Sequence, residues 1–373
     1  MRPIRETIPL DEAMALVFEM AAPIDRTERV SIREANGRVL ASAAVSAQDV
    51  PPFDRAAMDG YAVVAEDTFG AGRYEPKILR VVEKVYTGQV PTRAIAQGEC
   101  AEIATGAPMP AGANAVVMVE ETDKDADGNV RVFTPVYPRQ HVGRQAADIV
   151  SGQPVLQAGD ILNPSRIGAL AATGVLDVEV FAKPRVAILS TGNEIVDPGQ
   201  PLGPGQIYDI NQFTLSAIIE AHGGVAVTGR TAPDSLPELK AAIEAAAKED
   251  VVVFSGGSSV GERDLIMDAL HEIGEVIFHG IAVKPGKPTV FGRIGRKPVL
   301  GMPGYPTSCL SNAYMLLVPL LRRMARLAEH RPQVVRVPLS RRVVSTTGRH
   351  QFYTVRIENG QAVPAFKASG DIT

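Results

Sequence analysis

The chain has 373 residues, 45% of them hydrophobic, and a formal net charge of −4. Its length suggests two to four domains of roughly 100–200 residues each. The small net charge, without clustered Lys and Arg, excludes a dedicated nucleic-acid surface, and two distant cysteines exclude a disulfide framework or a CxxC metal site. The apolar runs are too short to span a membrane. We therefore expect a soluble, cytoplasmic, multidomain protein.

The first half of the chain combines two helical segments with a β-rich insert. Residues 8–22 and residues 165–173 carry apolar side chains at helical spacing. Between them, short apolar segments separated by Gly, Pro and an Asp-Gly-Asn turn are typical of a small β module. We predict an elongated N-terminal and linker domain, residues 1–48 and 141–183, with an inserted β module, residues 49–140.

The second half alternates between strands and helices. The predicted strands are residues 185–190, 225–228, 251–255 and a segment from 276 onward, and the predicted helices are residues 212–222, 235–248 and 264–273. This alternation favours a doubly wound α/β domain with a parallel sheet, residues 184–330. The segments 334–339, 341–346, 352–357 and 361–366 predict a C-terminal β domain, residues 331–373. The fold class is therefore α/β plus β.

Chemically suited residues follow the predicted parallel strands, at the edge where open α/β sheets bind ligands. They lie in residues 190–194, 255–264 and 284–288. The second segment leaves a buried strand through Gly256 and Gly257 and enters a helix, so its backbone N–H groups are suited to phosphate. A tight turn with Asp264 as the helix N-cap would explain the same residues without a ligand.

Two further features are compatible with ligand binding. Lys284 and Lys287 stand three positions apart, and because two close ammonium groups repel each other, an oxyanion between them would explain the spacing. Two solvated loop lysines are the alternative. In the β module, Asp59 and Thr105 lie in irregular segments, which are either simple turns or part of a site for Mg²⁺, a cation that takes a few carboxylates plus substrate oxygens and water.

Six motifs occur along the chain in a fixed order. They are FDRAAMDGYAV (Phe53–Val63), ATGAPMPAGANAVV (Ala104–Val117), ILSTGNEI (Ile188–Ile195), FSGGSSVGERD (Phe254–Asp264), VKPGKP (Val283–Pro288) and GMPGYPTS (Gly301–Ser308). Together they resemble the molybdopterin molybdenumtransferases, the MoeA family, which includes the gephyrin E domain. The resemblance covers essentially the whole chain, and the combination of SGGxSVGxxD, KPGKP and PGxPxS is highly specific.

The resemblance implies an elongated homodimer of four-domain chains whose α/β domain is MogA-like, similar to the molybdopterin adenylyltransferase fold. It implies a transferase that inserts molybdate into adenylyl-molybdopterin with release of AMP, assisted by Mg²⁺ or a similar divalent cation. Other molybdenum-cofactor biosynthesis proteins are candidate partners. Family members continue beyond the position of Thr373, so we expect the C-terminal β domain to be incomplete here.

The resemblance also implies site residues, position by position. The catalytic positions are Asp59, Thr105, Asp148, Glu194, Asp234 and Asp264, of which Asp59, Glu194 and Asp264 would hold the cation. The substrate-binding positions are Ser255, Gly256, Gly257, Ser258, Ser259, Gly261, Lys284, Lys287, Pro303, Gly304 and Arg349. Backbone N–H groups of the Gly256–Gly261 turn would bind phosphate, and the lysines would offset the charge of molybdate.

The chain departs from the family pattern at three places. Phe278-His279-Gly280 and the segment Pro303–Ser308 are more similar to a sub-branch that includes archaeal members, for which tungstate is a candidate substrate. Asp148 lacks the Gly-Glu that usually precedes it, and Gly280 stands where some bacterial members have a lysine. Three alternative functions stay open: a tungstate-using homologue, a non-catalytic scaffold of the same fold, and a nucleotide hydrolase that shares the α/β domain. Retention of the acids and both lysines disfavours the scaffold, and the β module disfavours the hydrolase.

Overall fold

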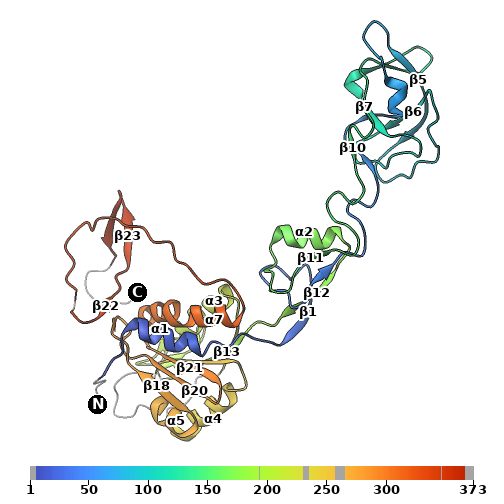
Figure 1. Ribbon diagram of the computed structural model, residues 1–373. Helices are drawn as coiled ribbons and strands as arrows, with labels where there is room; N and C mark the ends of the chain where they lie inside the picture. Colours follow the sequence, from blue (N-terminus) through green and yellow to red (C-terminus); the bar gives the residue numbers. More distant parts are fainter. Residues whose placement is uncertain (1–5, 193, 230–234, 257–264, 346, 366–373) are drawn as a thin grey trace. The chain divides into compact units, whose positions relative to one another are not determined.

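The computed structural model describes residues 6–192, 194–229, 235–256, 265–345 and 347–365. Its contacts divide the chain into two compact units (Figure 1). Unit 1 comprises residues 1–29, 37–41 and 179–373, and unit 2 comprises residues 30–36 and 42–178. The strands β1 (Thr27–Ser31) and β12 (Asp177–Phe181) lie where the chain passes from one unit to the other. The finer division into four domains remains a prediction.

Unit 2 is built on a six-stranded sheet in the order β7-β4-β6-β5-β9-β8, in which β5 and β6 are parallel and the other neighbours antiparallel. Its elements are β4 (Gly60–Val63), η1 (Ala65–Thr68), β5 (Lys77–Val85), β6 (Glu99–Ile103), β7 (Ala115–Met118), η2 (Val119–Glu121), β8 (Thr122–Lys124) and β9 (Val130–Val132). Tyr61 and Val63 join one buried cluster and Ala62 joins another, because successive strand residues face opposite sides. The β-rich texture predicted for this insert is confirmed.

The remainder of unit 2 consists of two short strand pairs and a helix. The pairs are β2 (Ala44–Val45) with β11 (Pro154–Leu156), and β3 (Arg55–Ala56) with β10 (Val142–Gly143). The predicted helix is α2 (Pro164–Ala172). It begins at Asn163, whose side chain accepts a hydrogen bond from the Arg166 N–H at 2.9 Å and so caps the helix.

Unit 1 contains a second six-stranded sheet, in the order β16-β13-β17-β21-β20-β18. Its strands are β13 (Arg185–Ser190), β16 (Val225–Thr228), β17 (Val251–Ser255), β18 (Glu275–His279), β20 (Val290–Ile294) and β21 (Lys297–Met302). The four strands β16, β13, β17 and β21 are parallel; the first three of these were predicted, and β21 was not. The sheet as a whole is mixed and not parallel as predicted. β20 forms a hairpin with β21 and pairs antiparallel with both β21 and β18. Gly295, at φ +59°, occupies the two-residue turn of that hairpin.

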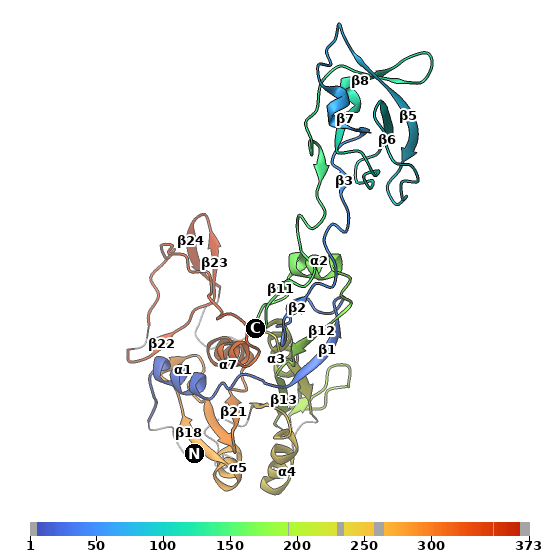
Figure 2. The same ribbon diagram turned by 45° about the vertical axis from the view of Figure 1, so that its right-hand side comes forward.

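Helices cover both faces of this sheet (Figures 1 and 2). One face packs against α1 (Leu10–Glu19), α3 (Asn211–Ala221) and a continuous helical run made of α6 (Pro306–Asn312), the π-helical turn η3 (Ala313–Leu317) and α7 (Val318–Met324). The other face packs against α4 (Leu236–Ala246) and α5 (Leu265–Ile273). Val253 faces the first layer and Phe254 the second, so β17 is buried on both sides and reads as a continuous apolar run.

The last described part of unit 1 has less regular structure than predicted. It contains β22 (His350–Gln351), β23 (Val355–Glu358) and β24 (Gln361–Pro364), while the short pairs β14 (Ile195–Val196) with β15 (Ile207–Tyr208), and β19 (Val283–Lys284) with β22, lie beside the main sheet. Residues 334–339, predicted as a strand, form an isolated bridge between Leu339 and Ala362 instead. Among the described residues, no helix is both long and apolar enough to cross a membrane.

Candidate functional site

A cavity of about 390 Å³ lies at the carboxyl ends of the parallel strands of unit 1. The chain leaves β13 toward β16 on one side and then crosses to β17 on the other, so the winding direction reverses between β13 and β17. Ligands of open α/β sheets bind at such reversal points. Five of the predicted site residues line this one cavity: Glu194, Ser255, Gly256, Pro303 and Gly304.

Gly256 ends β17 at a point where backbone packs against backbone. Its φ is +92°, and a Cβ added there would lie 2.8 Å from the carbonyl oxygen of Thr191. The Gly256 N–H donates to the Met302 carbonyl at 3.2 Å, so it is engaged within the fold. The rest of the Gly256–Gly261 turn, whose N–H groups are predicted to bind phosphate, lies outside the described residues, so that role stays a prediction. Because it lacks a Cβ, Gly256 allows the end of β17 to lie directly against the backbone of Thr191, which follows β13.

A buried carboxylate, Asp209, lies beneath the same cavity and was not predicted. It is 5% exposed; one oxygen accepts the Ser190 hydroxyl and the other accepts the Gln212 N–H at 2.9 Å. Asn211, 6% exposed, donates from Nδ2 to the Gly304 carbonyl at 2.7 Å. The start of α3 thus ties the end of β13 to the loop after β21. The available sequence signal was an Asp and an Asn just before a predicted helix.

Glu194 stands at the rim of the cavity. Its carboxylate packs over Gly192, where an added Cβ would lie 2.6 Å from Oε1, and Gly192 has φ +130°. The Glu194 carbonyl accepts from the Ile207 N–H at 2.8 Å, which joins the loop to β15. The side chain is exposed, so this acid remains open to a ligand.

The two lysines flank the loop that follows β19, hereafter the lysine loop (Lys284–Pro288). The Lys284–Pro285 peptide bond is cis, and Pro288 lines the cavity described above. The structure brings Arg349 to the same region, because β22, which begins one residue later, pairs in parallel with β19 through Val283 and His350. The Phe352 N–H donates to the Lys284 carbonyl at 2.8 Å and extends this pairing.

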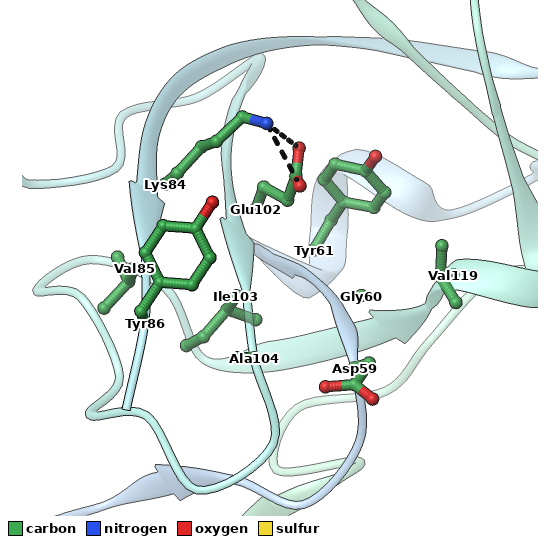
Figure 3. Close-up of a pocket in the computed structure, with 10 residues that line it drawn as sticks. All are labelled: Asp59, Gly60, Tyr61, Lys84, Val85, Tyr86, Glu102, Ile103, Ala104 and Val119. Carbon is green, nitrogen blue, oxygen red and sulfur yellow. Dashed lines mark hydrogen bonds and ion pairs between the residues drawn. The ribbon is translucent and has the colours of Figure 1, made fainter. Parts of the chain in front are cut away.

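Unit 2 holds a smaller pocket, about 180 Å³, that contains Asp59 (Figure 3). The Thr105 N–H donates to Oδ1 of Asp59 at 2.7 Å, so the structure brings these two predicted residues into contact. Hydrogen bonds from the Thr105 backbone and hydroxyl lower the pKa of the exposed Asp59 carboxyl. Gly60 follows in β4, where a Cβ would lie only 1.8 Å from the Val117 carbonyl oxygen.

An ion pair between Lys84 and Glu102 lines the same pocket (Figure 3). Glu102 accepts from Lys84 at 3.2 Å and from Lys124 at 2.8 Å. The hydrogen bond from Lys124 is the main reason that the pKa of Glu102 is lowered. Burial raises the pKa of the neighbouring Tyr61 hydroxyl. The pocket therefore contains two carboxylates: Glu102, which is paired with lysines, and Asp59, which is hydrogen-bonded by Thr105.

Asp148 lies apart from both pockets. It is exposed, and its N–H donates to the Val50 carbonyl at 2.9 Å in the segment that leads out of the six-stranded sheet of unit 2. Asp54, which was not predicted as a site residue, makes stronger contacts there: it accepts from the Gln145 N–H at 2.8 Å and pairs with Arg139. The bond from Gln145 is the main cause of its lowered pKa.

The remaining predicted positions lie outside the described residues. They are Asp234, Gly257, Ser258, Ser259, Gly261 and Asp264. Within the described part of the chain, no three His, Cys, Asp or Glu side chains come together as a metal site. Of the three predicted metal ligands, Asp59 belongs to unit 2 and Glu194 to unit 1.

Comparison with known proteins gives a consistent family. The model "MoeA N-terminal region (domain I and II)" matches residues 8–174, and the model "Probable molybdopterin binding domain" matches residues 187–323. The chain is 36% identical to molybdopterin molybdenumtransferase 2 of Mycobacterium tuberculosis, over 92% of this chain and 86% of the relative. It is 35% identical to molybdopterin molybdenumtransferase of Haemophilus influenzae, over 85% of this chain and 78% of the relative.

A solved structure of a molybdopterin biosynthesis MoeA protein from Pyrococcus horikoshii matches the fold with a TM-score of 0.82 and 43% identity. The match covers 98% of this chain and 91% of that one. The chain therefore has a MoeA-like multidomain fold. The chain belongs to the molybdopterin molybdenumtransferase family, a family of transferases in molybdenum cofactor biosynthesis.

Proposed function

We propose that this transferase inserts molybdate into adenylyl-molybdopterin, with release of AMP, to give molybdenum cofactor. The observation that carries the proposal is the cavity at the reversal point of the unit 1 sheet, which combines an exposed acid, Glu194, with the end of the lysine loop at Pro288. Such a cavity suits a ligand that carries both a phosphoanhydride and a polar ring system. The names of the curated relatives supply the reaction class.

The lysine loop would bind the oxyanion. Molybdate is a tetrahedral dianion, and two ammonium groups, Lys284 and Lys287, offset its charge while Arg349 approaches from β22. Residues Ser255 to Gly261, with Asp264, would contact the phosphates, and Pro303 and Gly304 would shape the opposite wall. Thr105 would orient Asp59, and Asp148 and Asp234 are proposed as further functional acids.

A divalent cation such as Mg²⁺ would need ligands from the substrate as well as from the exposed acids. Asp59 presents a single exposed carboxylate, and Mg²⁺ commonly takes one or two carboxylates with phosphate oxygens and water. Asp59, Glu194 and Asp264 are the residues that would hold it. When bound, the cation would stabilise negative charge on the departing phosphate.

The family resemblance supports a second proposal, that the enzyme is a homodimer whose partner chain helps complete each site. Asp59 and Glu194 belong to different units of one chain. Homodimers commonly use two-fold symmetry, so a shared site occurs twice. Sedimentation of the full chain at micromolar concentration tests this, and a monomer under turnover conditions contradicts it.

The proposed reaction is tested by following AMP release with purified full-length chain. We expect release to require both adenylyl-molybdopterin and molybdate. A nucleotide hydrolase would release AMP without molybdate, and a scaffold would release none. Replacing molybdate with tungstate in the same assay separates the two oxyanions: equal or faster release with tungstate favours the tungstate-using alternative.

A further inference from the structure

A buried asparagine holds the lysine loop from below. Asn312, the last residue of α6, is fully buried, and its Nδ2 donates to the Gly286 carbonyl at 3.0 Å and to Oγ1 of Thr289 at 2.5 Å. Thr289 is also fully buried, and its hydroxyl donates to the same Gly286 carbonyl at 2.9 Å. Two buried side chains therefore converge on one peptide group, which lies between the two lysines.

Gly286 is shaped to receive this asparagine. Its φ is +103°, and an added Cβ would lie 2.6 Å from both the nitrogen and the oxygen of the Asn312 amide. The amide thus packs directly against the Cα of Gly286, at a distance that only glycine permits. This contact, together with the two hydrogen bonds, fixes the turn between Lys284 and Lys287.

Asn312 lowers the stability of the fold compared with an apolar residue at the same position. Its neighbours Cys309, Ala313 and Leu316 belong to an apolar core cluster, and its Oδ1 is buried without a hydrogen-bond partner among the described residues. An unsatisfied buried acceptor costs about 1–3 kcal/mol. A buried side chain that lowers stability and lies at the base of the lysine loop is explained by a positioning role.

The charge of the lysine loop explains why its backbone would need to be held by these hydrogen bonds. Two ammonium groups a few residues apart repel each other, and a flexible turn would relax to separate them. On one side, β19 is fastened to β22 by the Phe352 N–H, which donates to the Lys284 carbonyl. On the other side, Asn312 and Thr289 hold the Gly286 carbonyl. The loop is thus anchored on both sides before any anion arrives.

We propose that Asn312 and Thr289 are positioning residues for oxyanion binding: they hold the Gly286 peptide so that Lys284 and Lys287 act together on one tetrahedral anion. This inference rests on the proposed function, since the anion is taken to be molybdate. Neither residue contacts the anion. Their effect is preorganisation, which lowers the cost of ordering the loop on binding.

The test measures molybdate binding directly, without the pterin substrate. Sodium molybdate is titrated calorimetrically into the full-length wild type, Asn312→Leu, Thr289→Val, Thr289→Ser and the control Ser311→Ala, which changes a partly exposed hydroxyl on the same helix. We expect the Kd for molybdate to rise about tenfold in Asn312→Leu and severalfold in Thr289→Val, as for the loss of preorganising contacts. Thr289→Ser, which keeps the hydroxyl, and the control should match the wild type.

A second measurement separates positioning from general damage. The half-saturating concentration of adenylyl-molybdopterin in AMP release should stay unchanged in the variants while that of molybdate rises. Equal losses for both substrates, or unchanged molybdate affinity in a folded Thr289→Val or Asn312→Leu chain, overturn the positioning role. If Asn312→Leu fails to fold, Thr289→Val with its serine rescue decides. A wild type that neither binds molybdate nor releases AMP would instead overturn the proposed function itself.

Discussion

The two pockets described above differ in how exposed their carboxylates are and in how those carboxylates are hydrogen-bonded. In unit 2, Asp59 is exposed and accepts hydrogen bonds from Thr105, which lower its pKa. In unit 1, Asp209 is 5% exposed, and both its oxygens are occupied, by Ser190 and by the Gln212 N–H. The first acid is kept ionised and open to a ligand, whereas the second is committed to the fold beneath the cavity.

This difference separates two kinds of functional residue. Groups that are proposed to bind a ligand stand at the surface of a pocket and lie in recognisable motifs, as Asp59 does in DGYA. Groups that shape a pocket are buried, as Asp209, Asn211 and Asn312 are, and each connects segments that are distant in the sequence. Substitutions of the two kinds should therefore affect different measurements.

The largest effect should come from Gly60→Ala. The new Cβ would lie 1.8 Å from the Val117 carbonyl oxygen, so β4 and β7 would have to separate, at a cost of roughly 4 kcal/mol or more. We expect the sheet of unit 2 to open while unit 1 stays folded. Gly72→Ala, where no atom lies within 4 Å of the added carbon, is the matched control.

The two cysteines report on the two units separately in that experiment. Cys100 lies in unit 2 and Cys309 in unit 1; both are fully buried, and burial raises the pKa of each thiol to about 12. Alkylation at pH 8 should therefore label neither in the native chain. In Gly60→Ala, Cys100 should react while Cys309 stays protected. Equal protection of both would show that unit 2 tolerates the added carbon.

A smaller effect is expected from Asp209→Asn. The amide oxygen and nitrogen cannot accept from both the Ser190 hydroxyl and the Gln212 N–H, so one buried donor loses its partner, at a cost of about 1–3 kcal/mol. In a urea titration, Cys309 should become reactive at lower urea and Cys100 should not change. Asp197→Asn removes an exposed carboxylate in the same unit and is the control. A urea dependence of Cys309 like that of the control would mean that Asp209 contributes nothing to unit 1.

The smallest effect concerns the titration of Asp59. Because Thr105 lowers its pKa, the carboxyl should titrate below its usual value of 3.8. Its contribution to the stability of unit 2 is then present above that usual value and is lost as the pH falls through the lowered one. Carbon NMR of the side chain in wild type and Thr105→Val measures this. The variant keeps the backbone bond, so its midpoint should move only part of the way back toward 3.8, and an unshifted wild-type midpoint contradicts the contact.

Local patterns predicted most of the regular structure. The continuous apolar run 251–255 became β17, and the helix predicted at 235–248 is α4, which Ser235 caps by accepting from the Glu238 N–H. The antiparallel path of β20 was missed, because a strand's direction depends on its partners rather than on its own residues. Residues 334–339 do not form the predicted strand for a related reason: a composition typical of strands does not ensure that a neighbouring strand is available to pair with.

The site was predictable where motif and topology coincide. Glu194 lies shortly after β13 and Ser255 ends β17, so the predicted strand order placed both at one edge of the sheet, whereas Gly304 was identified only through its motif. Asp209 and Asn312 could not be found in this way, because their roles depend on Ser190 and Gly286, which they meet only in the folded chain. No periodicity or spacing in the sequence records such a pairing.

The pairing of β19 with β22 has a consequence for how the enzyme matures. The strand that braces the lysine loop is synthesised after the whole sheet of unit 1 and after α7. Closing such a long intervening loop costs more entropy than forming a neighbouring hairpin, so this contact forms late. A nascent chain therefore acquires its cavity before its lysine loop is secured. Under the proposed role of that loop, the ability to bind an oxyanion would follow the pairing of β22 with β19 and not the folding of the sheet.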